Sequence, residues 1–433
     1  MQYRSTRGGQ LVGLEQAIMS GTAPDGGLYV PVKLPQLSLA AFDGATQLAG
    51  VAARLLQPFV AGSTLESGVT QLCAEAFDFP VPVRPLEEGL SVLELFHGPT
   101  AAFKDVGARF LAAAMARIAR ADSVRRDPVT ILVATSGDTG GAVAAAFHRR
   151  PGFRVVVLFP EGRVSPRQQH QLSCWGDNVL SLAVRGEFDD CQRLVKQAFA
   201  DADLRTRHNL CSANSINVGR LLPQAAYYAT ASLAHFRQHG RPASFIVPTG
   251  NLGNAFACVW ARRVGMPIER ILLATNANTT ITDFLATGQW LPRPTVPTLA
   301  SAMDVGNPSN MERLRDLCGT VTELREEVAA VSVTDAEIRT AIRDEFARHA
   351  IPWCPHTATA LHAYRQLPGS ERSGRHWIAV ATAHPAKFDT IVEPLLGHPV
   401  VPPPELARLL SLPARYETVA AELPELAARL GGR

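Results

Sequence analysis

Two hydrophobic patterns alternate along the chain from about residue 129 onward. Short, nearly continuous apolar runs rich in valine and isoleucine are separated by stretches with helical spacing of apolar residues. Continuous apolar strands that alternate with helices are typical of parallel sheets covered on both faces. The expected strands are Val129–Ala134, Arg154–Phe159, Asn178–Val184, Phe245–Pro248, Arg270–Ala274 and Trp377–Ala381. The pattern therefore predicts an α/β fold.

The expected helices fill the intervals between these strands. They are Val106–Ala119, Gly141–Arg149, Asp189–Ala200, Ser215–His235, Asn254–Val264, Thr334–Arg348 and Thr357–Leu367. Asp189 and Ser215 suit the N-cap position, because their side-chain oxygens can accept from free N–H groups at a helix start. The first 95 residues are more mixed and predict an N-terminal segment packed on the sheet domains. After Gly397 a Pro-rich and then Leu/Ala-rich stretch predicts a surface extension that ends in a short helix.

Charge and cysteine content exclude several classes of function. The 433 residues suffice for two or three domains, and a net charge of +3 is too small to indicate a nucleic-acid or membrane-surface partner. We see no apolar run of the length or placement that a membrane span or export signal needs. The seven cysteines form no Cys-x-x-Cys pair, which suits neither a disulfide framework nor a zinc site. They indicate reduced thiols and predict a cytoplasmic protein.

Lys104 lies among apolar and turn residues rather than on a charged face. Burial disfavours the charged form of a lysine and lowers its pKa, and the free amine can then condense with an aldehyde. His97–Thr100 predicts a tight turn just before this lysine, and a helix follows it. Lys104 is therefore a candidate Schiff-base nucleophile. The alternative is a surface lysine paired with Asp105.

Two glycine-containing turns each follow a strand and begin a helix. In Ala134–Gly141 and in Pro248–Asn254, unpaired backbone N–H groups at the helix start would favour a carboxylate or phosphate. Glycine is common in such turns of any α/β protein, so a purely structural role stays open for each. Ser136 and Thr139 favour a ligand at the first turn, and Gly250 and Gly253 permit close approach of a phosphate at the second.

Two further segments carry candidate binding groups. Cys211–Arg220 contains the polar side chains of Ser212, Asn214, Ser215 and Asn217 together with the guanidinium of Arg220, which suits a phosphate. A helix N-cap at Ser215 beside a solvated arginine is the alternative. At the end of the last apolar strand, Thr382 and His384 are candidates because strand carboxyl ends present functional side chains in α/β sheets.

Other catalytic classes lack their motifs. No Gly-x-Gly spacing, Gly-Lys dipeptide, Gly-x-Ser-x-Gly elbow or His-Glu-x-x-His sequence occurs, which disfavours Rossmann oxidoreductases, Walker-type NTPases, serine hydrolases and zinc enzymes. We expect no metal. An aldehyde for Lys104 and a phosphate for a glycine turn are both present in pyridoxal 5'-phosphate, which is the expected cofactor.

In family order, the motifs of this chain resemble those of the threonine synthase family, pyridoxal-phosphate enzymes of fold type II. The resemblance covers nearly the whole chain and is strongest to bacterial and fungal members. The matching motifs are Tyr3–Arg7, His97–Asp105, Thr135–Gly140, Ser212–Asn217, Thr249–Asn254 and Thr382–Phe388. It implies two open twisted sheet domains with helices on both faces, similar to the tryptophan synthase β subunit, plus an N-terminal segment. The implied division is an N-terminal segment of residues 1–95, a smaller domain of 96–210 with the lysine, and a larger domain of 211–433 with the phosphate loop.

The resemblance also implies a role for each motif. Lys104 would hold the cofactor as a Schiff base and would then move protons at Cα and Cβ of the substrate. Thr382 would hydrogen-bond the pyridine nitrogen. Ser136 and Thr139 would contact the substrate carboxylate or phosphoryl group. The cofactor phosphate would be bound by Gly250, Asn251, Leu252, Gly253 and Asn254, and the substrate phosphate by Asn214, Ser215 and Arg220.

The sequence departs from the family pattern in two motifs. Thr249 and Leu252 stand where Ser and Phe are common, and Ala101 replaces a usual Leu. Backbone contacts to a phosphate should survive the first change, whereas the second could loosen packing beside the lysine.

The implied reaction converts O-phospho-L-homoserine and water to L-threonine and phosphate, the last step of threonine biosynthesis, by γ-elimination and β-addition of water. Two alternatives stay open: a lyase that releases phosphate and a 2-oxo acid, and an inert anion-binding paralogue. We expect a small-molecule substrate, no nucleic-acid or membrane partner, and a monomer or homodimer.

Overall fold

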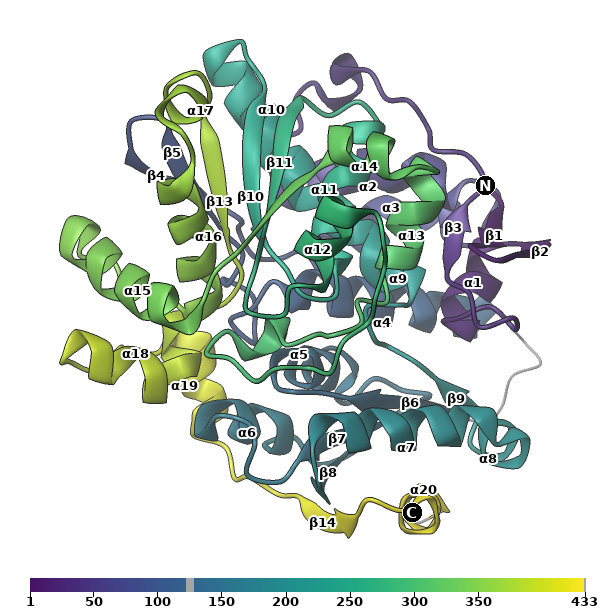
Figure 1. Ribbon diagram of the computed structural model, residues 1–433. Helices are drawn as coiled ribbons and strands as arrows, with labels where there is room; N and C mark the ends of the chain where they lie inside the picture. The colour runs from purple at the N-terminus through teal and green to yellow at the C-terminus, as the bar shows by residue number, and fades with distance from the viewer. Residues whose placement is uncertain (122–127, 432–433) are drawn as a thin grey trace.

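Two sheets with helices on both faces make up most of the molecule (Figure 1). The computed structural model describes residues 1–121 and 128–431. One sheet has six strands, and the second has five. The sequence prediction of an α/β fold with two covered sheets is confirmed.

The six-stranded sheet is parallel except at one edge, where β4 runs antiparallel to β5. In spatial order its strands are β12 (Ala329–Ser332), β11 (Ile268–Thr275), β10 (Ala243–Pro248), β13 (Trp377–Ala381), β5 (Leu90–Glu94) and β4 (Val83–Glu87). Successive side chains of β13 belong to different core clusters: Ile378 and Val380 pack with α10 and α11, and Ala379 packs with α16. This alternation follows from the two-residue period of a strand, and it explains why the strands are apolar throughout.

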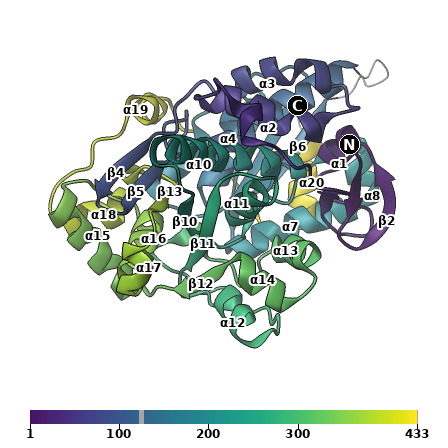
Figure 2. The same ribbon diagram turned by 90° about the horizontal axis from the view of Figure 1, so that it is seen from above.

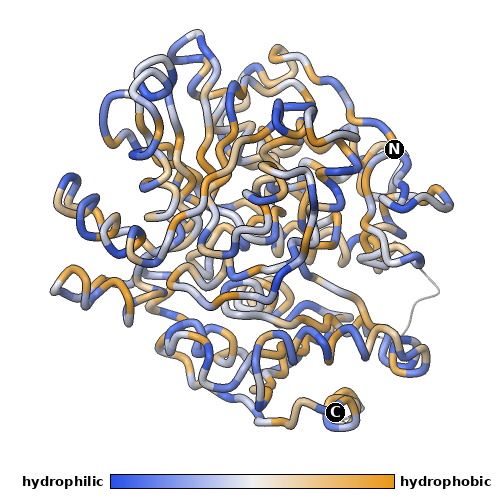
Figure 3. The backbone as a smooth tube through the Cα atoms, viewed as in Figure 1, coloured by the Kyte–Doolittle hydropathy of each residue, from blue (hydrophilic) through white to orange (hydrophobic). Residues whose placement is uncertain are grey.

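The five-stranded sheet is parallel throughout. Its order is β14 (Glu417–Ala420), β8 (Val179–Arg185), β7 (Phe153–Pro160), β6 (Val129–Ala134) and β9 (Leu210–Cys211). In β6, Ile131 and Val133 pack toward α5, whereas Leu132 and Ala134 pack toward α7. The tube in Figure 3 shows the apolar strands inside and the polar segments largely at the periphery.

Except for the segment predicted as one helix from Ser215, the predicted helices begin within three residues of the observed starts. The described α-helices are α1 (Leu14–Ser20), α2 (Leu48–Val60), α3 (Val69–Ala76), α4 (Lys104–Ala121), α5 (Asp138–Phe147), α6 (Pro166–Ser173), α7 (Phe188–Ala200), α8 (Ala202–Arg207), α9 (Val218–Leu221), α10 (Ala225–His239), α11 (Gly253–Arg263), α12 (Thr280–Thr287), α13 (Met311–Cys318), α14 (Val321–Glu327), α15 (Asp335–His349), α16 (Pro355–Gln366), α17 (Gly369–Ser373), α18 (Asp389–Leu396), α19 (Pro404–Leu410) and α20 (Leu423–Gly431). None of them has the length and apolar character that a membrane crossing requires.

Both predicted N-caps were wrong. Helix α7 is capped by Glu187, which forms a capping box with Asp190, so Asp189 lies inside the first turn. The segment expected as one helix from Ser215 is broken into α9, a 3₁₀ turn and α10, and the cap of α9 is Asn217. Asn217 Oδ1 accepts from Gly219 N at 2.9 Å. Pro223 interrupts the predicted helix because it has no N–H to donate.

The N-terminal residues pack on helices rather than directly on a sheet face. Helix α2 contacts α10, and α3 contacts α4. A small antiparallel sheet of β1 (Tyr3–Ser5), β2 (Gly8–Val12) and β3 (Tyr29–Pro31) lies beside α1, and Figure 2 shows it at the rim of the molecule. Strands β4 and β5, which also precede residue 96, belong to the six-stranded sheet.

The stretch after Gly397 ends in a short helix, α20, as predicted, but it is not a surface extension, and that part of the prediction was wrong. Strand β14 pairs in parallel with β8, and α20 places Leu426 and Leu430 in the core of the five-stranded sheet. Both leucines are about 1% exposed. The end of the chain thus returns to the sheet that residues 129–211 build.

This integration gives a stability prediction. Leu426→Ala should lower the free energy of unfolding by about 2–5 kcal/mol, because it leaves a cavity between α20 and α7. Urea unfolding measures the change. The neighbouring exposed Glu425→Ala is the control and should change the free energy by less than about 0.5 kcal/mol. Equal effects of the two substitutions would contradict the packing role of α20.

Candidate active site

The predicted site residues lie on the loops that follow parallel strands or in the first turn of the helices after those loops. Lys104 follows β5, Ser136 and Thr139 follow β6, Asn214 and Ser215 follow β9, the segment 250–254 follows β10, and Thr382 follows β13. The carboxyl edges of parallel strands are where open α/β sheets bind ligands. Segments that are far apart in sequence are thereby placed on matching edges of the two sheets.

The Lys104 loop is joined by its backbone to the loop that carries Thr382. Phe103 N donates to Thr382 O at 2.8 Å, and His384 N donates to Ala101 O at 3.0 Å. Ala101 is fully buried and has φ 54°, a left-handed conformation uncommon outside glycine. Two predicted site residues, Lys104 and Thr382, are therefore held beside each other.

Asp105 does not pair with Lys104, so the surface ion pair considered from sequence is absent. Its buried carboxylate accepts from Thr100 N at 2.8 Å and from Thr100 Oγ1 at 2.7 Å. Burial nevertheless raises the pKa of Asp105. Gly98 permits this closure, because a Cβ there would lie 2.5 Å from the Asp105 carboxylate.

The amine of Lys104 makes no hydrogen bond with the residues that the structure describes, and it lies over the Phe103 ring at 5.1 Å. Its pKa is lowered from 10.5 to about 8, chiefly by burial. Asp138 opposes this shift, whereas Arg220 and Lys387 add to it. A lysine in this state supplies a reactive free amine near neutral pH.

A buried ion pair joins the two sheets at the same place. Lys387 Nζ lies 2.9 Å from Asp138 Oδ1 and donates to Thr100 O at 2.6 Å. Gln168 Nε2 donates to the same Asp138 oxygen at 3.0 Å. Burial alone would raise the pKa of Asp138, but Lys387 and Lys104 lower it well below its usual range. Asp138 therefore stays ionised between two buried amines.

The second glycine turn is shaped by close backbone contacts. A Cβ on Gly250 would lie 2.5 Å from Met303 O, so no larger residue fits without a shift. Leu252 is buried with φ 62°, and it turns the chain into α11 at Gly253. The first N–H groups of α11 are thereby directed away from the helix body, as an anion site requires.

Asn251 and Asn254 fix this loop. Asn251 Oδ1 accepts from Ser309 N at 2.6 Å, and its Nδ2 donates to Ser215 Oγ at 2.8 Å. Asn254 Oδ1 accepts from the hydroxyls of Tyr227 and Tyr228. Asn254 Nδ2 is buried without a partner. A buried N–H with no acceptor is costly, and an oxyanion at this turn would satisfy it.

Ser215 lies against this loop, and its hydroxyl accepts from Asn251 instead of capping a helix. Arg220 is 2% exposed, and its NH1 donates to Ala213 O at 2.6 Å, while its Nε has no partner. Burial lowers the pKa of Arg220 to about 10. This guanidinium packs against Gly107, one turn beyond Lys104 on α4. Ser215 and Arg220 thus face different parts of the site.

Several predicted polar side chains have free hydrogen-bonding capacity. Within residues 1–121 and 128–431, the structure gives no hydrogen bond to the side chains of Ser136, Thr139, Asn214 and Thr382. The neighbouring Thr135 is satisfied, because its Oγ1 accepts from Gly137 N and Gly140 N at 2.9 Å each. The turn is thus built by Thr135, which leaves the hydroxyls beside it for a ligand.

Sequence reasoning missed Lys387 and His356. The chain contains only four lysines, and Lys33 and Lys196 are exposed, so the scarcity of lysine was a usable signal for Lys387. His356 Nε2 accepts from Ala302 N at 3.1 Å, which leaves Nδ1 as a buried donor without a partner. Burial lowers the pKa of His356 to about 4, so the ring is neutral. No sequence pattern marked this histidine.

His384, a candidate from sequence, caps a helical turn in the structure. Its Nδ1 accepts from Ala386 N at 3.2 Å and caps the 3₁₀ turn Pro385–Phe388. Its ring packs edge-on against Phe96 at 5.4 Å. Burial lowers the pKa of His384 to about 4.

These features fit a phosphate-bearing aldehyde. Lys104 offers an unpartnered amine, the turn at Gly250 offers backbone N–H groups and the orphaned Asn254 Nδ2, and Thr382 offers a free hydroxyl. In the part of the chain that the structure describes, no group of three or more His, Cys, Asp or Glu side chains is arranged for a metal.

Three family models match the chain. "Pyridoxal-phosphate dependent enzyme" matches residues 81–383, "Threonine synthase N terminus" residues 2–77, and "Threonine synthase, C-terminal" residues 357–429. The threonine synthase of Serratia marcescens is 41% identical over 96% of this chain and 95% of the relative. The crystal structure of threonine synthase from Escherichia coli has a TM-score of 0.91 at 37% identity, with 99% of each chain covered. The structure of PLP-bound threonine synthase from Brucella melitensis has a TM-score of 0.92 at 34% identity, covering 99% of this chain and 98% of that one.

The lowered pKa of Lys104 predicts a pH profile. The amine reacts only when neutral, so the rate at which pyridoxal 5'-phosphate attaches to cofactor-free protein should rise with pH and level off above about 8. Stopped-flow absorbance measures this rate. A free lysine side chain titrates near 10.4 and serves as the reference, which should still be gaining rate at pH 9. A protein profile that keeps rising past pH 9 would contradict the lowered pKa.

The buried ion pair predicts a non-additive double mutant. Asp138→Asn or Lys387→Met alone should cost about 3–5 kcal/mol of unfolding free energy, because each leaves one buried charge unpaired. The double substitution should cost less than the sum of the two single costs. The exposed pair of Asp203 and Arg207 is the control, and Asp203→Asn should cost under about 1 kcal/mol. Additive costs at 138 and 387 would show that the two charges are independent.

Proposed function

The chain belongs to the threonine synthase family, and we propose that the buried amine of Lys104 is the group on which its reaction depends. The chain is a pyridoxal-phosphate-dependent lyase that acts on a phosphate ester, converting O-phospho-L-homoserine and water to L-threonine and phosphate. The observation that supports the role of Lys104 is its unpartnered amine with a pKa near 8, beside the Thr382 loop.

Pyridoxal 5'-phosphate, when bound, withdraws electrons from the substrate and so makes protons near its amino group removable. Lys104 would hold this cofactor covalently, the turn Gly250–Asn254 would bind its phosphate, and the Thr382 hydroxyl would donate to its ring nitrogen. Because Thr382 is a neutral hydroxyl, it does not hold a proton on that nitrogen as a carboxylate partner would. Once released from the cofactor, Lys104 Nζ would carry protons at the substrate's Cα and Cβ.

The substrate contacts follow from the free polar groups around Lys104. Ser136, Thr139 and the first N–H groups of α5 would bind the substrate carboxylate. Arg220 and Asn214 would bind the substrate phosphate, since the buried Arg220 guanidinium has an unpartnered Nε. Ser215 would act through Asn251 by holding the cofactor-phosphate loop.

Lys387 and Asp138 would position the site rather than react. Lys387 fixes Thr100 O, and Asp138 lies within the electrostatic field of Lys104. The neutral His356 would donate from Nδ1 to an anionic group of the bound ligand. The neighbours of Asp138 and His356 thus set their charge states.

We propose that each of the two large sheets forms a domain that carries its own part of the site. The smaller domain, mostly residues 96–210, would carry Lys104 and the substrate-carboxylate turn, and the larger one, mostly residues 211–433, the cofactor-phosphate loop. Strand β5 and strand β14 cross these boundaries.

The small-molecule reaction needs no other partner, and a monomer or homodimer would suffice. The odd number of cysteines, all of them buried, suits the reducing cytoplasm.

Replacement of Lys104 tests this function. Lys104→Ala should lose at least about 10³-fold in turnover of O-phospho-L-homoserine and should lack the visible absorbance of lysine-bound cofactor. Phosphate release and the amino-acid product are followed together. Lys196→Ala, at an exposed lysine on α7, is the matched control and should keep wild-type turnover.

The product decides between this reaction and its alternatives. Threonine formed in equal amount to phosphate supports the synthase. A 2-oxo acid in place of threonine would indicate a lyase that does not retain water at Cβ. Unchanged turnover by Lys104→Ala would sink the role assigned to the amine, and no turnover by the wild-type holoenzyme would indicate an inert anion-binding paralogue.

A further inference from the structure

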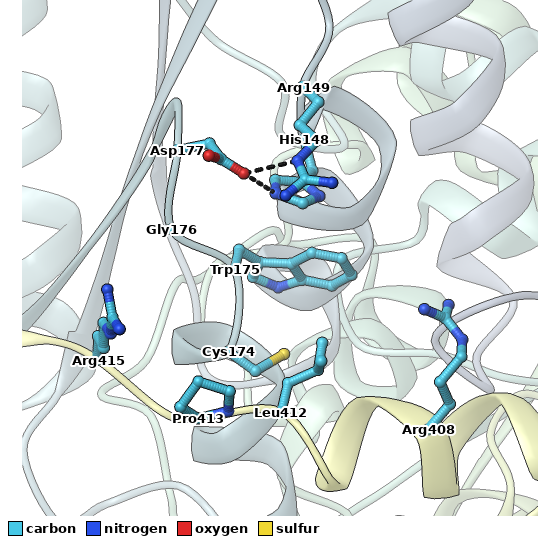
Figure 4. Close-up of a pocket in the computed structure, with 10 residues that line it drawn as sticks. All are labelled: His148, Arg149, Cys174, Trp175, Gly176, Asp177, Arg408, Leu412, Pro413 and Arg415. Carbon is cyan, nitrogen blue, oxygen red and sulfur yellow. Dashed lines mark hydrogen bonds and ion pairs between the residues drawn. The ribbon is translucent and has the colours of Figure 1, made fainter.

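A basic cavity outside the active site is lined by residues that the reaction does not use. Its volume is about 440 Å³, and it lies between the end of α5, the end of α6 and the segment that follows α19 (Figure 4). A second cavity of about 490 Å³ adjoins it and shares His148, Arg149, Trp175 and Arg408. Both volumes fall within the range of small-molecule sites, roughly 300–1,000 Å³.

Positive charge is concentrated in these two cavities. Their walls include six arginines but only two carboxylates, although the net charge of the whole chain is just +3. The arginines are Arg109, Arg120, Arg149, Arg150, Arg408 and Arg415, and the carboxylates are Glu75 and Asp177. Glu75 pairs with Arg150, Asp177 pairs with Arg149, and Asp78 pairs with Arg109, so the excess of arginines over these pairs is what would raise the local concentration of anions.

Arg408 and Arg415 carry the argument because no carboxylate balances them. Asp177 already pairs with Arg149 at 2.7 Å and with His148 at 3.0 Å. Arg408 and Arg415 form no ion pair with any residue in the part of the chain that the structure describes. Figure 4 shows them extending from the C-terminal segment on either side of the Trp175 ring. Two guanidiniums of this cavity are thus available to an anion.

The walls of the cavity are held in place by hydrogen bonds. Arg149 has φ 54°, and its N donates to Asn178 Oδ1 at 2.7 Å. Asn178 Nδ2 in turn donates to Phe147 O and to Phe153 O, at 2.9 Å each. Asp177, which lies two residues after Trp175, also has a positive φ. These arrangements place Arg149 and Asp177 in fixed positions before any ligand binds.

We propose that this basic cavity is a binding site for a small anion with two or more phosphate groups. Arginine pairs with phosphate through two parallel hydrogen bonds, and arginines spread over two adjoining cavities match several phosphates better than one. The occupant ties Arg408 and Arg415 of the C-terminal segment to Arg149 at the end of α5. It thereby stabilises the packing of the last residues on the five-stranded sheet.

The cavity is connected to the Lys104 loop by two hydrogen bonds. Trp175 Nε1 donates to Gln171 O at 2.7 Å, and Gln171 Nε2 donates to Thr100 O at 3.2 Å. Thr100 is the residue that Lys387 and Asp105 also contact. Pro99, its neighbour, lines the second cavity. An occupant of the basic cavity therefore lies against the back of the loop that presents the reactive lysine.

Calorimetric titration of the holoenzyme with inorganic triphosphate tests the site. The cavity variant, Arg408→Gln/Arg415→Gln, should bind triphosphate at least about tenfold more weakly than wild type. Without ligand, it should keep the turnover and thermal stability of wild type. The control Arg339→Gln/Arg343→Gln removes two exposed, unpaired arginines from α15 and should bind within about twofold of wild type. Triphosphate should also raise the Tm of the wild type and of the control, but not that of the cavity variant.

Further ligands define the class of anion. Orthophosphate should bind at least about tenfold more weakly than triphosphate, and ATP compared with inorganic triphosphate shows whether a nucleotide or a free polyphosphate is the preferred source. If the cavity variant binds triphosphate as tightly as wild type, the anion binds in the active site or elsewhere, and the proposal is overturned. Equal binding of orthophosphate and triphosphate would overturn the requirement for several phosphates.

Discussion

One buried carboxylate between two buried amines holds the site together. Asp138 begins α5 beside the five-stranded sheet, and Lys387 follows the last strand of the six-stranded sheet, with 2.9 Å between their charged atoms. A buried charge is costly unless an opposite charge and hydrogen bonds compensate it. If the two sheets separated, each of these buried charges would lose its partner. The same carboxylate opposes the fall in the pKa of Lys104, which keeps that pKa near 8.

The segment around Lys387 connects this ion pair to α6. Ser165 Oγ donates to Lys387 O at 2.9 Å, and Arg167 NH1 donates to Ala386 O at 2.8 Å. On its other side, the backbone of the Thr382 loop pairs with the Lys104 loop. The loops that carry Lys104 and Thr382 and the lysine that joins the two sheets are therefore parts of one hydrogen-bonded unit. A change at any of these contacts is expected to reach the others.

The strands named above were predicted reliably from the local sequence. Both faces of each sheet are covered, so nearly every residue of such a strand is buried and apolar. The run Val129–Ala134 has the same limits in the structure, as does Trp377–Ala381. Helix starts were less reliable. Ser215 has the side chain of an N-cap, but Asn251 from a distant loop donates to its hydroxyl, and Asn217 caps the helix instead. The choice between two capable side chains was made by a neighbour that sequence order does not reveal.

The sequence by itself determined the alternation of strands and helices, the glycine turns and the position of Lys104 before a helix, since these depend on the spacing of nearby residues. Only the tertiary structure decided that Asp105 pairs with Thr100 rather than Lys104, that β14 returns to the five-stranded sheet, and that Lys387 and His356 lie close enough to Asp138 to interact with its charge. Strand β14 and Lys387 meet partners more than 200 residues away in sequence, and the Asp105–Thr100 contact, between residues only five apart, depends on burial of its turn. Such contacts leave no periodic pattern along the chain, because their energy arises only when the two sheets close around them.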